Sequence, residues 1–243
     1  MDSTITTLKK NSNRPDFVSI VVLRTIGNFL ILLALFLTVR TFQNPVIEEF
    51  RYFSDKITHK KYVLADDSPI AFQKDYSLHK KKGGLNDLSN SENIEIIKPI
   101  DPQYSIVIPK INANARVIPN VDASNRAGYL DALKQGIAHA AGTANPGEKG
   151  HMFYFAHSTD NFWNVTRYNA IFYLLYKLEI GDEVNIYYQG KRHKYIVTGH
   201  EIIEPNQVEY LTRKTKKDFV TLQTCWPLGT TFKRYLVFAE PKK

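Results

Sequence analysis

Short β-prone runs recur between turn residues from Tyr104 to the end of the chain. They are rich in β-branched and aromatic residues, and Gln189-Gly190 between two of them is a hairpin signal. Many short strands in this arrangement predict an antiparallel β-barrel or sandwich. A helix is plausible at Asn169–Leu178, ended by Gly181. The predicted strands are 104–108, 115–121, 151–156, 183–188, 191–200, 218–224 and 234–239.

A long apolar stretch near the N-terminus predicts a membrane anchor. Residues 17–39 have the length of a helix that spans a bilayer, and only Arg24 and Asn28 interrupt their first half. A cleavable signal peptide is the alternative, but no small-x-small cleavage site follows the stretch, so an uncleaved span is favoured. The basic residues before the span favour a cytoplasmic N-terminus with the following domain outside the cell, but Arg40, Arg51 and Lys56 follow the span and make the charge asymmetry modest.

The segment between the span and the β-rich region has the composition of a stalk. A short helix is expected from Pro45 to about Ile57. The following polar run is rich in Lys, Gly, Asn and Ser, so much of 65–95 is expected to be poorly ordered. Four parts result: a cytoplasmic tail at 1–16, a transmembrane anchor at 17–39, an extracellular stalk at 40–100 and a catalytic domain at 101–243.

The charge distribution and the cysteine content exclude two classes of protein. The net charge of +8 is spread along the chain without the clustered basic and aromatic residues that nucleic-acid binding needs, so no nucleic-acid partner is expected. The chain has one cysteine, which excludes a framework of internal disulfides. A lone thiol on an exported protein is either a buried, inert side chain or one kept for chemistry.

Cys225 lies at the end of a predicted strand, and Arg234 opens the next one after a Pro/Gly-containing turn. If the two strands form an antiparallel hairpin, these residues face each other with Cβ atoms about 5 Å apart. A thiol beside a permanent cation suits a nucleophilic thiolate and an oxyanion-stabilising group. The alternative is a small buried cysteine and a surface arginine, and position alone does not decide between the two interpretations.

A thiol nucleophile needs a proton carrier, for which histidine is the usual residue. Among seven histidines, His157 ends an apolar predicted strand, as Cys225 does. His139, in the turn-rich segment 138–150, is the next candidate. Spacing alone leaves both open.

Several ordered motifs resemble those of the sortases over residues 104–239. Thr221-Leu222-Gln223-Thr224-Cys225 followed by Pro227, Gly229 and Arg234 resembles the family's TLxTC…R signature. Three further segments are similar to the first barrel strand, the GTA-x-PGE-x-G turn and the L-x-x-GD-x-(V/I) segment of the family. They are 106–111, 142–150 and 178–184.

The resemblance implies a closed eight-stranded β-barrel with one or two short helices, and a membrane-anchored cysteine transpeptidase. Cys225 matches the nucleophile, His157 the general acid/base and Arg234 the residue that positions the substrate and stabilises the oxyanion. Thr224 is expected to contact the substrate through its hydroxyl. The implied substrates are proteins with an LPxTG-like sorting signal, and the implied acceptor is an amine of the cell wall or of a pilin.

The chain also departs from the family pattern. Ala156-His157-Ser158 stands where the family often has Gly-His-Arg, so substrate contacts beside the histidine are expected to differ. The Cys-x-Pro-x-Gly loop is closest to classes D and E, and the lack of a second apolar span after the last strand argues against the pilus-polymerising type. No cofactor is expected. Glu201, Glu204 and Glu209 are the candidates for a calcium site, which the sequence does not support.

Two other classes of protein remain as alternatives. An extracellular cysteine peptidase would use the same cysteine and histidine but release its product to water. The papain-like pattern places the cysteine early, on a helix, whereas His157 precedes Cys225 here. A catalytically silent β-domain that acts as an adhesin or scaffold is the second alternative.

Overall fold

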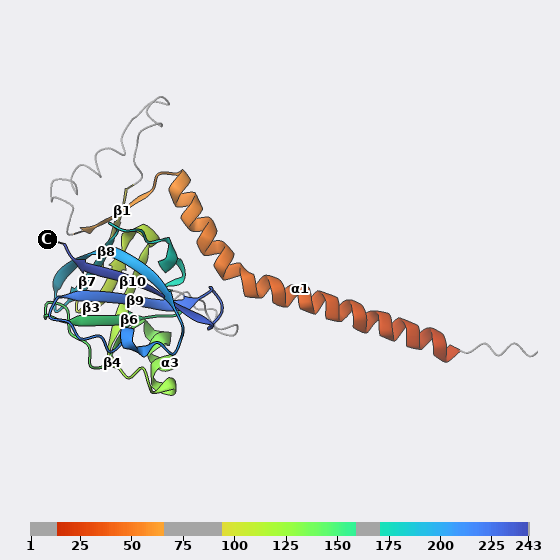
Figure 1. Ribbon diagram of the computed structural model, residues 1–243. Coiled ribbons are helices and arrows are strands. Elements are labelled where there is room, and N and C mark those ends of the chain that lie inside the picture. The colour runs from red at the N-terminus through yellow and green to blue at the C-terminus, as the bar shows by residue number, and fades with distance from the viewer. Residues whose placement is uncertain (1–13, 66–93, 159–170, 243) are drawn as a thin grey trace, which may run out of the picture. The chain divides into compact units, whose positions relative to one another are not determined.

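The computed structural model describes residues 14–65, 94–158 and 171–242 (Figure 1). The chain divides into two compact units, Met1–Asn44 and Pro45–Lys243. Most of the segment expected to be poorly ordered, 65–95, lies outside the described residues.

Helix α1 runs from Arg14 to Ile57, and Val18–Val39 within it has a mean hydropathy of 2.4 with no part buried. By length and composition this stretch is able to cross a membrane. A span and a separate short helix from Pro45 were expected, but one helix runs through Pro45 without a break. The predicted end of the helix at Ile57 is confirmed.

Eight strands of the second unit form a closed barrel in the order β10-β8-β7-β3-β4-β5-β6-β9, which confirms the predicted fold class (Figure 1). Two neighbouring pairs, β4–β5 and β6–β9, are parallel, so the expected all-antiparallel arrangement is wrong at these two places. Parallel neighbours need a long crossover connection, which local hairpin signals do not reveal. The strands are β3 (Tyr104–Ile108), β4 (Ala113–Val121), β5 (Ile137–Ala140), β6 (His151–Phe155), β7 (Glu183–Tyr188), β8 (Lys191–Ile203), β9 (Phe219–Trp226) and β10 (Lys233–Pro241).

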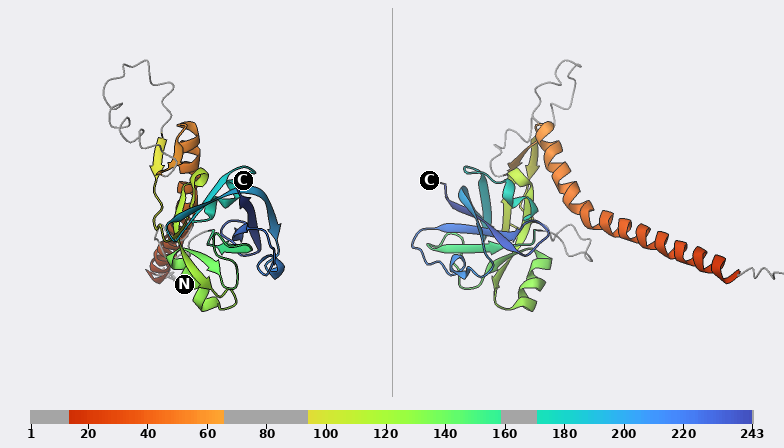
Figure 2. Two further views of the ribbon diagram at one scale, coloured as in Figure 1. Left: turned by 90° about the vertical axis from the view of Figure 1, so that its left-hand side faces the viewer. Right: turned by 45° about the vertical axis from the view of Figure 1, so that its right-hand side comes forward.

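The crossover between β4 and β5 contains helix α3 (Arg126–Gln135), which packs on both strands (green in Figure 2). Asn125 caps it by accepting a hydrogen bond from the Gly128 amide at 3.1 Å. Neither α3 nor β5 was predicted. Strand β5 has only one β-branched residue, Ile137, and so carries a weak strand signal. The helix expected at Asn169–Leu178 is the short 3-10 helix η3 (Tyr173–Lys177) in its described part.

Four smaller elements, two strands and two 3-10 helices, lie in the described part of the unit. Strands β1 (Lys61–Leu64) and β2 (Ile94–Ile97) form a two-stranded parallel sheet within the region predicted to be a stalk. Leu64 and Ile97 pack against buried residues of β3 and β7. The 3-10 helices η2 (Pro109–Ile111) and η4 (Val208–Tyr210) lie in connections between strands.

Hydrophobic clusters cover both faces of the strands that carry the candidate site. On β6, Met152 and Tyr154 belong to the main core cluster, whereas Phe153 and Phe155 belong to a second cluster with Leu133 of α3. Successive side chains of a strand point to opposite faces, so the main cluster fills the barrel and the second covers its outside. Both faces of β6 are therefore shielded up to its last residue.

Two buried histidines are expected to make stability depend on pH. Burial lowers the pKa of His139 and of His151 to about 4, while each ring hydrogen-bonds a threonine hydroxyl at 2.8 Å. In the unfolded chain each imidazole is protonated as the pH falls below about 6.5, whereas in the folded chain it stays neutral down to about pH 4. Stability is therefore full above about pH 6.5 and falls as the pH drops towards 4. From pH 7 to 5 the expected loss in unfolding free energy is about 2 kcal/mol per histidine.

Urea denaturation of the full chain in detergent, read by tryptophan fluorescence at pH 7 and 5, measures this effect. His139→Gln and His151→Gln should each remove part of the pH dependence, whatever they do to stability at pH 7. An equal pH dependence in the wild type and the double variant would contradict the assignment.

Candidate active site

The parallel pairing of β6 and β9 brings the histidine segment beside the cysteine. Phe155 pairs with Gln223, and the ladder extends one step further because the Ala156 amide donates to the Gln223 carbonyl at 3.1 Å. Continued two residues beyond β6, this register puts His157 level with Cys225. Backbone pairing thus brings together two chain segments that are 68 positions apart in the sequence.

On the other side of β9, Arg234 of β10 is the direct antiparallel partner of Cys225. This confirms the hairpin expected from the sequence. The Arg234 Nη1 donates to the carbonyls of Thr231 and Lys233 at 3.0 Å, which holds the guanidinium at the mouth of the loop between the two strands. Cys225 therefore has the imidazole segment on one flank and a fixed cation on the other.

All three positions belong to the outer face of the barrel. Leu222 of β9, Ala156 after β6 and Tyr235 of β10 lie in the main core cluster. Because side chains alternate along strands, Cys225 and Arg234 fall on the opposite face, and the same alternation continued past the end of β6 puts His157 there too. Cys225 and His157 are half-buried there, where the strands leave the outer hydrophobic cluster.

Thr224 lies on the inner face. Its side chain is 2% exposed, and its hydroxyl donates to the Ala156 carbonyl at 3.1 Å. This bond ties β9 to the residue directly before His157. The structure thus places Thr224 behind the site, where its hydroxyl fixes the spacing of the strands; its expected contact with substrate stays a prediction.

The electrostatics of the thiol combine two opposing effects. Burial raises the pKa of Cys225 above its ordinary value, and the nearby Arg234 guanidinium lowers it in part. The net shift is upward, so the resting thiol is protonated at neutral pH. A protonated thiol needs a base to become a nucleophile, and His157 follows the end of the neighbouring strand β6 by two residues.

Replacing Arg234 by alanine is expected to raise the pKa of Cys225 further, because the cation that favours the thiolate is lost. The rate of iodoacetamide alkylation at a fixed pH near 8 should fall severalfold, and its pH profile should move to higher pH. Arg234→Lys should retain most of the wild-type rate. Lys233→Ala, which removes a neighbouring exposed charge, serves as the control, and an equal effect of both alanine variants would contradict a specific role for Arg234.

Aromatic side chains pack beside Cys225, and no sequence motif predicted this group. The Trp226 ring, next to the cysteine, lies 5.5 Å from the Tyr235 ring and 5.6 Å from the Tyr176 ring of η3. Tyr176 in turn donates a hydrogen bond to Glu49 of α1. The only sequence signal for this group was the position of Trp226 directly after the cysteine.

The other sequence candidates lie elsewhere. His139 was expected in a turn, but it lies on β5, is 3% exposed, and bonds Tyr104 Oη at 2.7 Å. With both ring nitrogens engaged inside the barrel, it has a structural environment. Of the calcium candidates, Glu201 accepts from Tyr210 Oη at 2.9 Å and Glu204 pairs with Lys233 at 3.2 Å. Within the described ranges, no three His, Cys, Asp or Glu side chains gather as a metal site would require.

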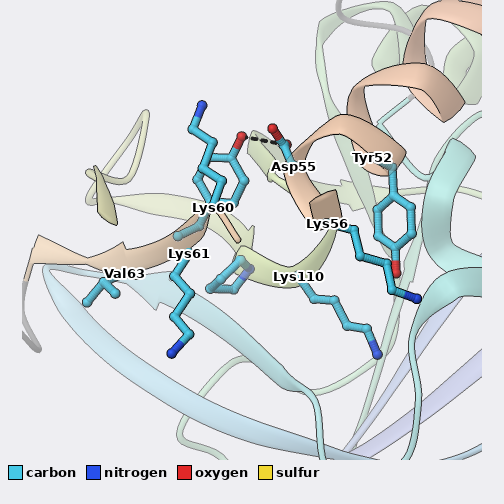
Figure 3. Close-up of a pocket in the computed structure, with 9 residues that line it drawn as sticks. Tyr52, Asp55, Lys56, Lys60, Lys61, Val63 and Lys110 are labelled. Carbon is cyan, nitrogen blue, oxygen red and sulfur yellow. Dashed lines mark hydrogen bonds between the residues drawn. The ribbon is translucent and has the colours of Figure 1, made fainter. Parts of the chain in front are cut away.

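A cavity of about 340 Å³ lies apart from these residues, between the end of α1, β1 and η2 (Figure 3). Lys56, Lys60, Lys61 and Lys110 line it, but their ammonium groups point in different directions (Figure 3). Lys60 pairs with Glu95, and Lys110 pairs with Glu179 and Asp182. The lysines do not converge on a common point, so the thiol and its flanking residues define the candidate active site.

A closed eight-stranded barrel with a thiol between a histidine segment and an arginine is the framework of a cysteine enzyme of acyl transfer. Residues 106–242 match the family model of the sortase domain. The chain therefore belongs to the sortase family, whose members are cysteine transpeptidases.

Relatives of several sortase classes are similar to this chain. Sortase D of Bacillus subtilis (strain 168) is 24% identical over 163 residues, which cover 65% of this chain and 74% of that protein. The crystal structure of sortase C-1 from Actinomyces oris has 29% identity and a TM-score of 0.49, with 59% of this chain and 74% of that chain covered. The Clostridium perfringens Sortase D5 transpeptidase has 22% identity and a TM-score of 0.47, with 72% and 91% covered.

Proposed function

We propose that Cys225, His157 and Arg234 carry out a two-step transpeptidation on an LPxTG-like sorting signal. His157 takes the thiol proton, and the sulfur attacks the carbonyl carbon of the Thr–Gly peptide bond. Arg234 stabilises the negative charge that develops on the carbonyl oxygen. The C–N bond then breaks, and the leaving amine receives its proton from His157. An acceptor amine next attacks the thioester, and breakage of the C–S bond restores the thiol.

The position of Cys225 between two different partner strands supports this proposal most directly. Parallel pairing with β6 supplies the acid/base, and antiparallel pairing with β10 supplies the cation. A buried cysteine without function requires neither partner. The half-buried, protonated thiol also fits a resting enzyme that becomes nucleophilic only when its base is in place.

The substrates, acceptor and location belong to the same proposal. The substrates are secreted proteins with an LPxTG-like signal, and the acceptor is an amine of a peptidoglycan crossbridge or a pilin lysine. The span at Val18–Val39 anchors the enzyme in the cell membrane as a single-pass protein, with the catalytic domain outside the cell. The loop after Cys225 favours class D or E. The reaction uses no cofactor.

Incubation of the full chain in detergent with an LPxTG-type peptide and hydroxylamine tests the proposal by mass spectrometry. The expected product is the hydroxamate of the fragment that ends in threonine, because hydroxylamine intercepts a thioester. Hydrolysis of the peptide at a rate that added amines do not change, without hydroxamate, would favour a cysteine peptidase. No cleavage of any member of a varied LPxTG library by folded protein would overturn the assigned substrate class.

A further inference from the structure

The part of α1 that follows Pro45 carries four large apolar side chains on its exposed side. Ile47, Phe50, Phe53 and Ile57 are 59%, 71%, 59% and 61% exposed, respectively. Their spacing of three, three and four residues places them along one side of the helix. These four residues form the apolar stripe.

The other side of the same helical segment is polar and is held by the barrel domain. Glu49 accepts a hydrogen bond from Tyr176 and lies 3.1 Å from the Lys177 ammonium group. That ammonium group also lies 5.3 Å from the ring centre of Tyr52. These contacts hold the helix against η3 through Glu49 and Tyr52, while the four side chains of the apolar stripe stay mostly exposed.

This arrangement is the reverse of the usual one for a helix on a soluble domain, which buries its apolar side. A contiguous apolar surface marks an interaction with another protein or with a membrane. Continuity with the span favours the membrane: Val39 ends the apolar segment of α1, and Ile47 follows eight residues later on the same helix. Only eight positions separate Val39 from Ile47 in the sequence, so the stripe follows the span within a short length of chain.

We propose that residues 47–57 of α1 form an interfacial helix whose apolar stripe lies in the headgroup–acyl boundary of the bilayer. The proposal rests on the membrane anchoring proposed above. Phenylalanine and isoleucine on one side, with charged residues on the other, are the composition of helices that lie in this boundary. The barrel domain contacts this helix through Tyr176 and Lys177, so an interfacial helix would also hold the domain close to the membrane surface.

Labelling of the full chain in lipid vesicles tests this directly. Cys225→Ala removes the one native cysteine. Phe50→Cys, Phe53→Cys or Lys56→Cys is then added, and each cysteine is labelled with the environment-sensitive dye NBD. Lys56 is also exposed but lies off the stripe, so it is the matched control. In phosphatidylcholine–phosphatidylglycerol vesicles, the labels at 50 and 53 should emit further to the blue. They should be quenched severalfold more by lipids with a spin label near the headgroup, and severalfold less by iodide.

Three outcomes would overturn the proposal. Equal iodide quenching at Phe50, Phe53 and Lys56 would show that the stripe faces water. Shielding from both quenchers, with self-quenching relieved by dilution into unlabelled protein, would show that a second copy covers it. Release of the protein from the vesicles by alkaline carbonate would overturn the anchor as well. Retention with a water-exposed stripe would overturn only the interfacial helix.

Discussion

Cys225→Ala is expected to abolish hydroxamate formation, with a loss in kcat/KM of about 10⁴–10⁶-fold. Without the sulfur no thioacyl intermediate forms, and no described neighbour on β9 or β10 provides another thiol. Cys225→Ser should also be strongly impaired, because a serine hydroxyl is a far weaker nucleophile without dedicated activation. Activity is measured with the peptide and hydroxylamine assay, and the covalent adduct is sought by intact-protein mass spectrometry.

The folded state should survive this substitution. Cys225 is half-buried and outside the main core cluster, so the change in unfolding free energy should be below about 1.5 kcal/mol. A melting curve close to that of the wild type therefore serves as the control. A folded Cys225→Ala protein that still forms the hydroxamate would show that the thiol is not the nucleophile.

His157→Gln is expected to lower kcat/KM by about 10²–10⁴-fold. The resting thiol is protonated because burial raises its pKa, so removal of the base leaves little thiolate at neutral pH. The same substitution removes the acid that protonates the leaving amine. Activity should partly return at high pH, where the thiol ionises without help, and a rate–pH profile of the variant measures this return.

His139→Gln is the matched comparison, since His139 was the second candidate for the base. Its ring is enclosed by Tyr104 and Thr143, so the variant should lose stability but keep the activity of its folded fraction. Loss of activity in folded His139→Gln with full activity in His157→Gln would reverse the two assignments.

Local sequence signals predicted the strands that carry the site, and for physical reasons they predicted little of how the strands pair. β-propensity predicted strands at 218–224 and 234–239, and the structure has β9 at 219–226 and β10 at 233–241. The antiparallel hairpin considered for them is confirmed, with Arg234 as the partner of Cys225. The level position of His157 depends on parallel pairing between strands far apart in the sequence, which the residues alone left open.

Other features were missed because tertiary packing decides them. Strand β5 consists of Ile137-Ala138-His139-Ala140, a weak strand sequence that is fully buried between β4 and β6. Its burial turns His139 from a candidate base into a member of a hydrogen-bonded core. The Thr224 hydroxyl likewise donates to the Ala156 carbonyl, a partner 68 residues away that local sequence could not predict.

The position of β9 between β6 and β10 also sets the order in which the candidate site is assembled during synthesis. A chain emerges from its N-terminal end, so β9 and β10 are the last strands to appear. Until β10 fills the gap between β8 and β9, the barrel is open and Arg234 has no place beside the sulfur. The arrangement proposed for catalysis, with Arg234 opposite Cys225, is therefore complete only when the last strand of the barrel has formed.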